Sequence, residues 1–322
     1  MAAWAALALP AVARADDPGL LLVYPTHATP ERLIAAGRFI EDEGQRAPRK
    51  SASRLRNAIE AAKALESDEI EGAVVEVSVG GRSFRAVTDD EGLWRIDTPL
   101  ERPLGVGPQA IVARAIDDKG HPAPSATGFV YVLPAGPSVA VISDYDDTVV
   151  HSGITSRRRM VATALLKNSA QLRPVAGAAR TYRAWREAGA AAVFYVSGSP
   201  QNFVPRVLDF LGRNRFPDGP LLLKDFGTDP TFDQVGYKLG RLRGILEAHP
   251  QTRFLLVGDS GEKDPEIYAR LRGYYPDRVL GIVIRRVHGS DLTGARFTGM
   301  TVVDDFTDTP RLIGLLRPKA AP

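Results

Sequence analysis

The sequence predicts an α/β protein in two parts, a β-rich first half and a second half in which helices wrap a parallel sheet. The first half contains short β-branched or aromatic runs that are separated by Gly, Asp and Pro clusters. Beyond Pro134 a fully apolar run opens a regular alternation of strand-like and helix-like segments. The chain has 322 residues, 44% hydrophobic and 25% charged, which is ordinary globular usage and enough for two hydrophobic cores.

The composition excludes several classes of site. The chain contains no cysteine, which rules out disulfides, thiolate metal sites and cysteine nucleophiles. It contains five histidines, none at metal-ligand spacing from another, so we expect no histidine-built zinc site. The formal charge of +3 is too small to indicate a nucleic-acid partner, and we expect none.

Residues 1–15 predict a cleaved export signal. They form a short apolar run that ends in Ala13-Arg14-Ala15, a small-x-small cleavage pattern. The run is shorter than the roughly 20 residues that span a bilayer, so the mature chain is expected to lack a transmembrane segment. The prediction is a periplasmic or secreted protein; because the start lacks basic residues, a cytoplasmic, membrane-peripheral protein is the alternative.

Residues 16–135 are predicted to form a small β-sandwich with one helical insert. Gly80-Gly81 is a two-residue hairpin signal, and the apolar spacing between Arg46 and Asp68 is helical. This part shows no catalytic constellation, so we expect a structural or docking role. The predicted strands are Leu20–Tyr24, Val74–Val79, Ser83–Val87, Leu93–Ile96, Ile111–Ala115 and Phe129–Leu133.

Residues 136–322 are predicted to form a doubly wound domain with helices on both faces of a parallel sheet. In such a sheet ligands bind beyond the carboxyl ends of the strands, so polar residues just past those ends are the candidates for a site. The predicted strands are Val139–Ile142, 191–196, 220–223, 253–257 and 279–284, and the predicted helices are 175–188, 200–213, 238–248 and 265–272.

Two candidate groups follow the first two strands. Asp144 and Asp146 come directly after the first strand, and alternation puts both on one side of a still-extended chain. Such a pair can share a divalent cation or divide the work of nucleophile and proton donor. Ser197-Gly198 follows the second strand, with Ser199 predicted as the N-cap of a helix that begins at Pro200 and forms an anion site.

The remaining candidates surround the strand at 253–257. Asp259 follows this strand, and we expect it to face Asp144 across neighbouring strand ends. Asp264, before Pro265, is predicted to cap the next helix, and Lys238 opens the helix that leads into this strand.

This set resembles the haloacid dehalogenase superfamily of phosphohydrolases. The longer strings at 143–148, 196–200 and 258–268 are more narrowly similar to the actin-patch-associated phosphatidate phosphatase catalytic-domain family and its bacterial members. The resemblance covers about residues 137–290 and implies a Rossmann-like haloacid dehalogenase fold with a minimal cap. The matching motifs are Asp144-x-Asp146-x-Thr148, Ser197, Lys238 and Gly258-Asp259-x4-Asp264.

The resemblance implies a Mg²⁺-dependent phosphatase that works through an aspartyl-phosphate. Asp144 would be the nucleophile, and Asp146 would protonate the leaving alcohol and then deprotonate the hydrolytic water. Mg²⁺ would be held by Asp144, the Asp146 backbone and Asp259, while Asp264 would bind metal water or cap its helix. Lys238 and Ser197, with Gly198, would hold the phosphoryl group.

The substrate is expected to be a bulky or membrane-embedded phosphate ester, most of all phosphatidate, which would give diacylglycerol. Only 26 residues separate Thr148 from Val175, too few for a folded cap, and Arg157-Arg158-Arg159 in this connection can steer toward anionic lipid. The alternatives are a general or phosphoprotein phosphomonoesterase of the same fold, and a catalytically vestigial secreted binding protein. A serine protease centred on Ser260 is disfavoured by Glu262 and by the strand-then-helix pattern.

Overall fold

We describe a computed structural model of the protein, which divides into two compact units. The first unit comprises residues 1–46 and 63–132, and the second comprises residues 47–62 and 133–322. The structure describes residues 19–316 apart from 43, 45–46, 67–68, 117–121, 152–165, 225–233 and 288–294. The predicted signal at residues 1–15 and the basic run Arg157-Arg158-Arg159 lie outside the described residues.

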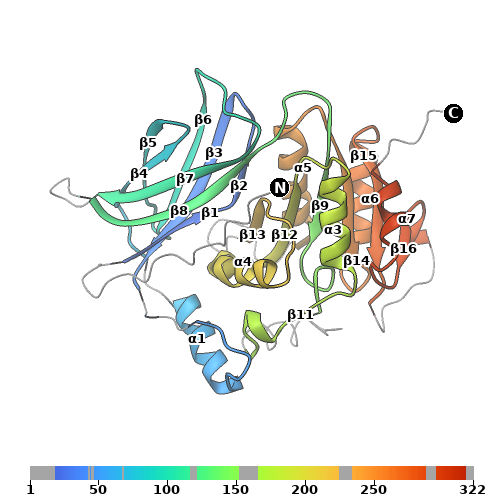
Figure 1. Ribbon diagram of the computed structural model, residues 1–322, viewed down its shortest axis with the longest axis horizontal. Helices are drawn as coiled ribbons and strands as arrows, with labels where there is room; N and C mark the ends of the chain where they lie inside the picture. Colours follow the sequence, from blue (N-terminus) through green and yellow to red (C-terminus); the bar gives the residue numbers. More distant parts are fainter. Residues whose placement is uncertain are drawn as a thin grey trace. The chain divides into compact units, whose positions relative to one another are not determined.

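The first unit is β-rich and contains two sheets (Figure 1). One sheet is antiparallel, in the order β1-β3-β6, and consists of β1 (Leu20–Tyr24), β3 (Arg32–Ile40) and β6 (Leu93–Pro99). The other has the order β2-β8-β7-β4-β5 and consists of β2 (Thr26–Ala28), β8 (Pro122–Val132), β7 (Gly107–Ile116), β4 (Val74–Val79) and β5 (Arg82–Val87). Both sheets contribute to one hydrophobic core, in which Leu33 and Trp94 of the first sheet join Val77 and Ile111 of the second.

Turn chemistry and strand composition account for what the sequence did and did not predict in this unit. The β4–β5 hairpin turns at Gly80 and Gly81, both with positive φ (56° and 74°), as a type I′ turn requires, so the hairpin prediction is confirmed. Strand β3 was not predicted because Ala, Gly and Arg are weak strand formers. Its alternate residues, including Leu33 and Phe39, are nevertheless buried in the core.

The second unit is built on a six-stranded parallel sheet in the order β13-β12-β9-β14-β15-β16. In chain order this is 3-2-1-4-5-6, the order of doubly wound folds, and the order reverses between β9 and β14. The strands are β9 (Ser138–Asp144), β12 (Val193–Pro200), β13 (Leu221–Lys224), β14 (Thr252–Asp259), β15 (Val279–Arg285) and β16 (Thr301–Val303).

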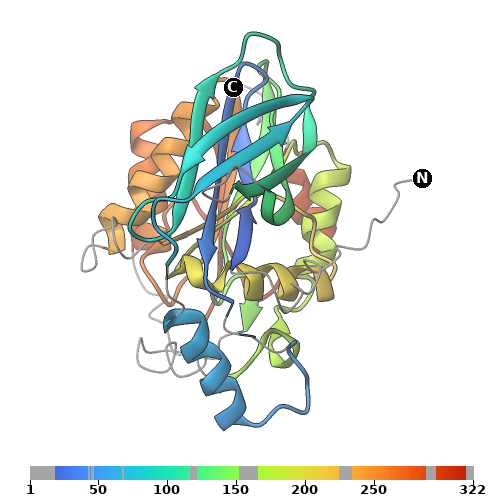
Figure 2. The same ribbon diagram turned by 90° about the vertical axis from the view of Figure 1, so that its left-hand side faces the viewer.

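Helices cover both faces of this sheet (Figures 1 and 2). Helices α5 (Gln234–Ala248) and α6 (Asp264–Tyr274) pack through Leu242, Ile245 and Leu271 on the face that carries Ile142 and Phe194. On the other face, aromatic side chains of α3 (Ala178–Glu187) and α4 (Val204–Arg213) meet Tyr145, Tyr195 and Phe216. The short helix α7 (Thr309–Gly314) lies against α3, where its Leu312 carbonyl accepts a hydrogen bond from Trp185.

A small antiparallel ribbon continues the chain beyond the carboxyl end of β9. Strands β10 (Val150–His151) and β11 (Arg173–Pro174) pair with each other, and the 3₁₀ turn η1 (Ser169–Gln171) precedes β11. Two further 3₁₀ turns are η2 (Gln201–Phe203) and η3 (Ala295–Phe297).

Most of the helical insert predicted between Arg46 and Asp68 belongs to the second unit. Helix α1 (Arg54–Glu66) begins there, and residues 47–62 group with the second unit. Asn57 of α1 donates to the Leu166 carbonyl (2.8 Å) and to Gln171 (2.6 Å). Gln171 in turn donates to the Ala52 carbonyl (2.8 Å), so the insert and the turn η1 are joined in both directions.

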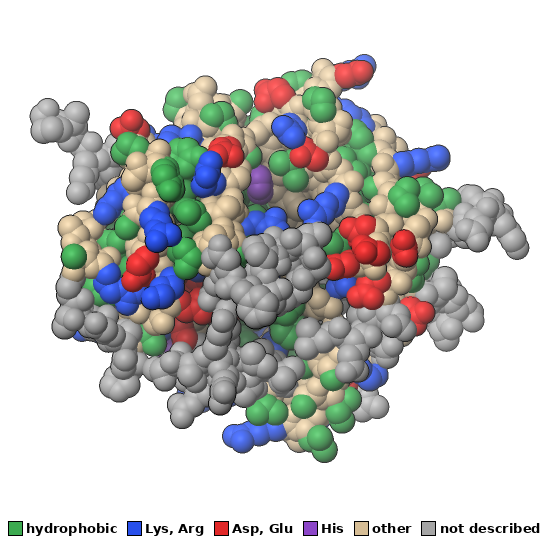
Figure 3. All heavy atoms as spheres, turned by 180° about the vertical axis from the view of Figure 1, so that it is seen from behind, with side chains coloured by type: hydrophobic (Ala, Val, Ile, Leu, Met, Phe, Trp, Pro, Cys, Tyr) green, Lys and Arg blue, Asp and Glu red, His purple; other side chains and the backbone are tan. Residues whose placement is uncertain are grey.

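In the described part of the chain, no helix combines the length and the apolar character that crossing a membrane requires. The face drawn in Figure 3 carries basic and acidic side chains together with hydrophobic ones, in line with the small net charge of +3.

Candidate active site

The candidate site lies where the strand order of the parallel sheet reverses. Strand β9 ends at Asp144 and its neighbour β14 ends at Asp259, and Ser143 of β9 is paired with Val257 of β14. This register places Asp259 one residue beyond the level of Asp144 at the same edge of the sheet. Ligands of doubly wound sheets bind at this switch point, and the sequence prediction that these two residues face each other agrees with the geometry.

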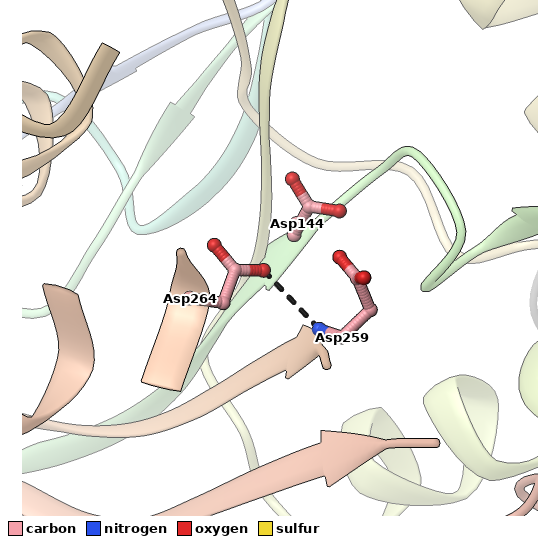
Figure 4. Close-up of side chains that lie close together, drawn as sticks. All are labelled: Asp144, Asp259 and Asp264. Carbon is pink, nitrogen blue, oxygen red and sulfur yellow. Dashed lines mark hydrogen bonds between the residues drawn. The ribbon is translucent and has the colours of Figure 1, made fainter. Parts of the chain in front are cut away.

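Three buried carboxylates meet at this edge, and we call Asp144, Asp259 and Asp264 the acidic trio. One carboxylate oxygen from each lies within 4.8 Å of the others, and the three side chains point toward one another (Figure 4). Lys238 of α5 reaches the same point: its Nζ contacts Asp144 Oδ1 at 2.6 Å and also contacts Asp264 Oδ1. All four side chains are almost fully buried.

The charge balance of this group explains its pKa values. Three carboxylates share one ammonium, and burial makes the excess negative charge costly. Burial accordingly raises the pKa of Asp144 well above its usual value, against the opposing effect of Lys238. Burial and the neighbouring Asp264 raise the pKa of Asp259 to about 8. Contacts with Asp144 and Asp264 outweigh burial at Lys238 and hold its pKa well above the usual value.

A divalent cation fits the acidic trio. Asp144 Oδ2 and Asp259 Oδ2 are buried and have no hydrogen-bond partner among the described residues. Unpaired buried carboxylate oxygens are costly, and hard cations such as Mg²⁺ take oxygen ligands of this kind. Asp146 is not part of this cluster of side-chain oxygens.

Asp264 has a different local role from the one predicted. It was expected to cap the helix at 265, but α6 includes Asp264 and its N-cap is Lys263, so the capping prediction is wrong. Asp264 Oδ2 instead accepts a hydrogen bond from the backbone N–H of Asp259 (3.2 Å, Figure 4). A Cβ on Gly258 would lie 2.3 Å from that oxygen, so only glycine lets the Asp264 carboxylate approach the end of β14.

Asp146 and Ser197 form a second group beside the trio. Ser197, buried in β12, donates through Oγ to Asp146 Oδ2 (2.7 Å), and Ser199 Oγ donates to the same oxygen at 3.3 Å. Burial raises the pKa of Asp146, while the bond from Ser197 lowers it. A raised pKa favours the protonated form that a general acid needs. Gly198 lies half-buried in β12 between the two serines.

The helical segment after Ser197 begins one residue later than predicted, and Ser199 is not its N-cap. Strand β12 continues through Pro200, which is the N-cap of the 3₁₀ turn η2, and α4 follows this turn directly from Val204. Ser199 is therefore a strand residue that binds Asp146, and the N-cap prediction is wrong. Its hydroxyl was assigned to a cap because Ser-Pro pairs commonly start helices.

Sequence reasoning missed Arg285. It lies at the carboxyl end of β15, opposite Asp259, and its Nη1 donates to the Asp147 carbonyl at 2.6 Å. Asp147 has a positive φ of 51°, which is uncommon for a residue with a side chain. Arg285 thus fixes the turn that follows Asp144 and Asp146. No local sequence signal links residues 138 positions apart.

Ser260 has a structural role at the end of β14. Its backbone N–H donates to the Arg285 carbonyl (2.9 Å), and its Oγ accepts from the backbone N–H of Val287 (2.8 Å). These bonds join the loop after β14 to the loop after β15. The Ser260 hydroxyl is therefore part of the contact between these two loops.

The part of the chain that carries this site has a known counterpart. Residues 139–286 match the family model of the catalytic domain of phosphatidate phosphatase APP1. The matched segment includes every predicted site residue, from Asp144 to Asp264.

Two fungal proteins are similar to the same part of the chain. Phosphatidate phosphatase APP1 of Saccharomyces cerevisiae is 33% identical over 174 residues, which cover 52% of this chain and 29% of that protein. An uncharacterized protein of Schizosaccharomyces pombe is 28% identical over 163 residues, which cover 48% of this chain and 26% of that protein. The chain thus spans less than a third of these relatives.

A solved carbohydrate acetylesterase from Xanthomonas citri aligns with 92% of this chain and 73% of that chain. The TM-score is 0.32 and the identity 11%, which is too low to support any inference about fold or activity.

Proposed function

We propose that this protein is a Mg²⁺-dependent phosphatidate phosphatase with a haloacid dehalogenase fold, and that its product is diacylglycerol. The observation that carries the proposal is the position of the acidic trio and Lys238 at the switch point of the parallel sheet, inside the segment that matches a phosphatidate phosphatase catalytic domain. The 3-2-1-4-5-6 strand order supports the Rossmann-like part of the fold assignment.

The metal would be held by Asp144 and Asp259, whose unpartnered oxygens are available, with Asp264 beside them and the Asp146 backbone as a further ligand. When bound, Mg²⁺ would offset the negative charge of the phosphate and of the carboxylates, so that an anionic nucleophile can approach phosphorus. Because the pKa of Asp259 is raised, its carboxyl would lose a proton when the metal binds.

Asp144 is the proposed nucleophile. Lys238 Nζ holds its Oδ1, which orients the carboxylate and favours its ionised form against the effect of burial. A carboxylate oxygen of Asp144 forms a bond to phosphorus as the bond from phosphorus to the alcohol oxygen breaks, which gives an aspartyl-phosphate and releases diacylglycerol.

Asp146 is the proposed general acid and base. Because its pKa is raised, Asp146 is available in the protonated form. It gives this proton to the departing alcohol oxygen and becomes a carboxylate. That carboxylate then takes a proton from the water that attacks the aspartyl-phosphate. The phosphorus–oxygen bond to Asp144 breaks, inorganic phosphate leaves, and both aspartates return to their starting forms.

Ser197 and Lys238 are proposed to hold the phosphoryl oxygens, with Gly198 beside them. The buried Lys238 ammonium is held by two carboxylates and is therefore positioned before substrate arrives, as electrostatic stabilisation requires. The Ser197 hydroxyl already binds Asp146, so it links the acid to the phosphoryl site.

Phosphate release from phosphatidate in mixed detergent micelles tests the proposal, with Asp144→Asn as the blank. We expect Mg²⁺-dependent release that EDTA abolishes and that the Asp144→Asn variant lacks. Turnover of soluble phosphate esters or phosphoproteins with none of phosphatidate would instead indicate a phosphomonoesterase of another specificity. No turnover of any phosphate ester in the presence of Mg²⁺ would indicate a vestigial site.

A further inference from the structure

Helix α1 exposes a hydrophobic stripe. Leu55 and Ile59 keep 72% and 51% of their surface exposed, and they are four residues apart, so both lie on one side of the helix. Asn57 and Ala61 are buried, as expected for the opposite side. Exposing two large aliphatic side chains to water costs free energy, and burying them in an apolar environment would remove that cost.

The chain around this stripe is strongly basic. Between residues 49 and 63 there are five basic residues and one acidic residue, Glu60, which directly follows Ile59. Arg49, Lys50 and Arg54 are exposed, Arg56 is half-buried, and none forms an ion pair with an acid in the part of the chain that the structure describes. An apolar stripe flanked by basic side chains is the pattern of a helix that lies in the surface of an anionic membrane.

The helix is firmly attached to the unit that carries the candidate site. Asn168, the N-cap of the turn η1, donates hydrogen bonds to the Asn57 side chain of α1 (2.9 Å) and to the Arg49 carbonyl (2.9 Å). Beyond η1, β11 pairs with β10, which continues directly from the Asp144–Thr148 turn. Figures 1 and 2 show α1 next to the segment that leads into β11.

We propose that α1 docks the protein on an anionic lipid surface, with Leu55 and Ile59 inserted among the lipids and the basic residues of 49–56 against the headgroups. An anionic lipid surface matches this segment, because a bilayer has an apolar layer directly beneath its negatively charged headgroups. The inference rests on the proposed function, whose substrate is itself an anionic lipid, and it adds the surface that would bring the site to that lipid.

Vesicle flotation of the full chain tests this docking surface. The lipids are phosphatidylcholine alone and phosphatidylcholine with phosphatidylglycerol, an anionic lipid that is not the proposed substrate. We expect the wild type to bind the anionic vesicles, to bind the neutral ones weakly, and to dissociate as salt is added. The Leu55→Ser/Ile59→Ser variant should bind the anionic vesicles at least about tenfold more weakly, because it loses two inserted aliphatic side chains.

Matched controls separate the α1 surface from general surface effects. Val87 and Val106 are 61% and 58% exposed in the first unit, and Val87→Ser/Val106→Ser should bind vesicles as the wild type does. Arg54→Gln/Arg56→Gln should weaken binding and reduce its salt dependence, whereas Arg102→Gln/Arg114→Gln, at exposed positions of the first unit, should not. Equal vesicle binding by the wild type and the Leu55→Ser/Ile59→Ser variant would overturn the proposal, as would no binding by the wild type.

Two activity measurements keep this inference apart from the proposed function. Hydrolysis of a soluble aryl phosphate and of phosphatidate in detergent micelles should be the same in the wild type and in the Leu55→Ser/Ile59→Ser variant, which also shows that the variant folds. Vesicle binding that depends on α1 in a protein that does not hydrolyse phosphatidate would retain the docking surface and reject the substrate. Hydrolysis of phosphatidate without vesicle binding that depends on α1 would retain the substrate and reject the docking surface.

Discussion

The Arg285 guanidinium donates a 2.6 Å hydrogen bond to the carbonyl oxygen of Asp147, a residue whose φ is positive. This bond holds the turn that directly follows the two aspartates proposed for chemistry. We expect Arg285→Gln to leave the buried carbonyl without its charged donor, at a cost of about 1–3 kcal/mol in the free energy of unfolding. Activity should fall as well, because the turn positions Asp146.

Chemical denaturation and steady-state kinetics measure both effects. The neighbouring Arg286→Gln is the control, since Arg286 pairs at 3.2 Å with an exposed Asp304 and should contribute little. Equal stability and activity of the two variants would contradict a positioning role for Arg285.

Gly258→Ala is expected to disturb the acidic trio. The added Cβ would lie 2.3 Å from Asp264 Oδ2, so the Asp264 carboxylate would have to leave the backbone N–H of Asp259. We expect a loss of about 1–3 kcal/mol in the free energy of unfolding and much weaker Mg²⁺ binding. Gly281→Ala, in the adjacent β15, meets its nearest atom at 3.4 Å and should be tolerated. Calorimetric Mg²⁺ titration of the two variants makes the comparison, and equal affinities would show that Gly258 is not required.

Mg²⁺ binding is expected to depend on pH through Asp259. Its pKa of about 8 in the metal-free protein means that the carboxyl is largely protonated at pH 7 and must lose that proton to bind a cation. Affinity should therefore rise with pH up to about 8, and at pH 7 binding should release about one proton or more.

Titration calorimetry in two buffers of different ionisation enthalpy counts the protons. Asp259→Asn should bind the metal weakly and release fewer protons, while the exposed Asp304→Asn should behave as the wild type does. Proton release that is unaffected by Asp259→Asn would mean that another group titrates.

Ser197→Ala should move the pH–rate profile in a defined direction. The 2.7 Å bond from Ser197 lowers the pKa of Asp146, so its removal raises that pKa and keeps the acid protonated to higher pH. The alkaline limb for a substrate with a poor leaving group should shift upward, in addition to a lower rate from the lost phosphoryl contact. Ser199→Ala removes a longer contact of 3.3 Å and should shift the limb less. A lower rate with an unmoved limb would argue against Asp146 as the acid.

The first unit should lose stability in acid because of His27. Burial lowers the pKa of His27 to about 4 in the folded protein, whereas the unfolded chain binds a proton near pH 6.5. The free energy of unfolding is thus highest above pH 6.5 and falls as the pH decreases toward 4, by on the order of 3 kcal/mol. Hydrogen exchange of the β2 and β8 amides measures this dependence, which should be smaller in His27→Gln. An unchanged dependence in that variant would assign the acid sensitivity to other groups.

The parts of the site that sequence predicted are those set by local pattern. Apolar runs predicted strands that end at 142 and 257, two residues short of the observed ends at Asp144 and Asp259, and parallel-sheet geometry places such ends at one edge. The interpretation failed where the fold, and not the local pattern, decides which partner a side chain meets. Asp264 looked like a cap because it precedes Pro265, yet its carboxylate binds the N–H of Asp259 and the ammonium of Lys238.

Strand β3 and Arg285 also depend on partners from other strands, which the local sequence pattern does not reveal. The strand has few β-branched residues and is stabilised by its partners β1 and β6, which propensity does not reveal. Arg285 ends a strand that was predicted, but the contact with the Asp147 carbonyl depends on how three parallel strands align.

The path of the chain through the two units has a consequence for how the protein can be made and divided. Residues 47–62 leave the ribosome before the segment that binds them, since Asn57 and Gln171 are 114 positions apart. Pairing over such a distance is slow to form, so the insert has to wait for its partner during synthesis. For the same reason a truncated chain that begins at residue 136 would retain the acidic trio but lack residues 49–57, the hydrogen-bond partners of Asn168 and Gln171. The second unit is continuous in space and discontinuous in the sequence.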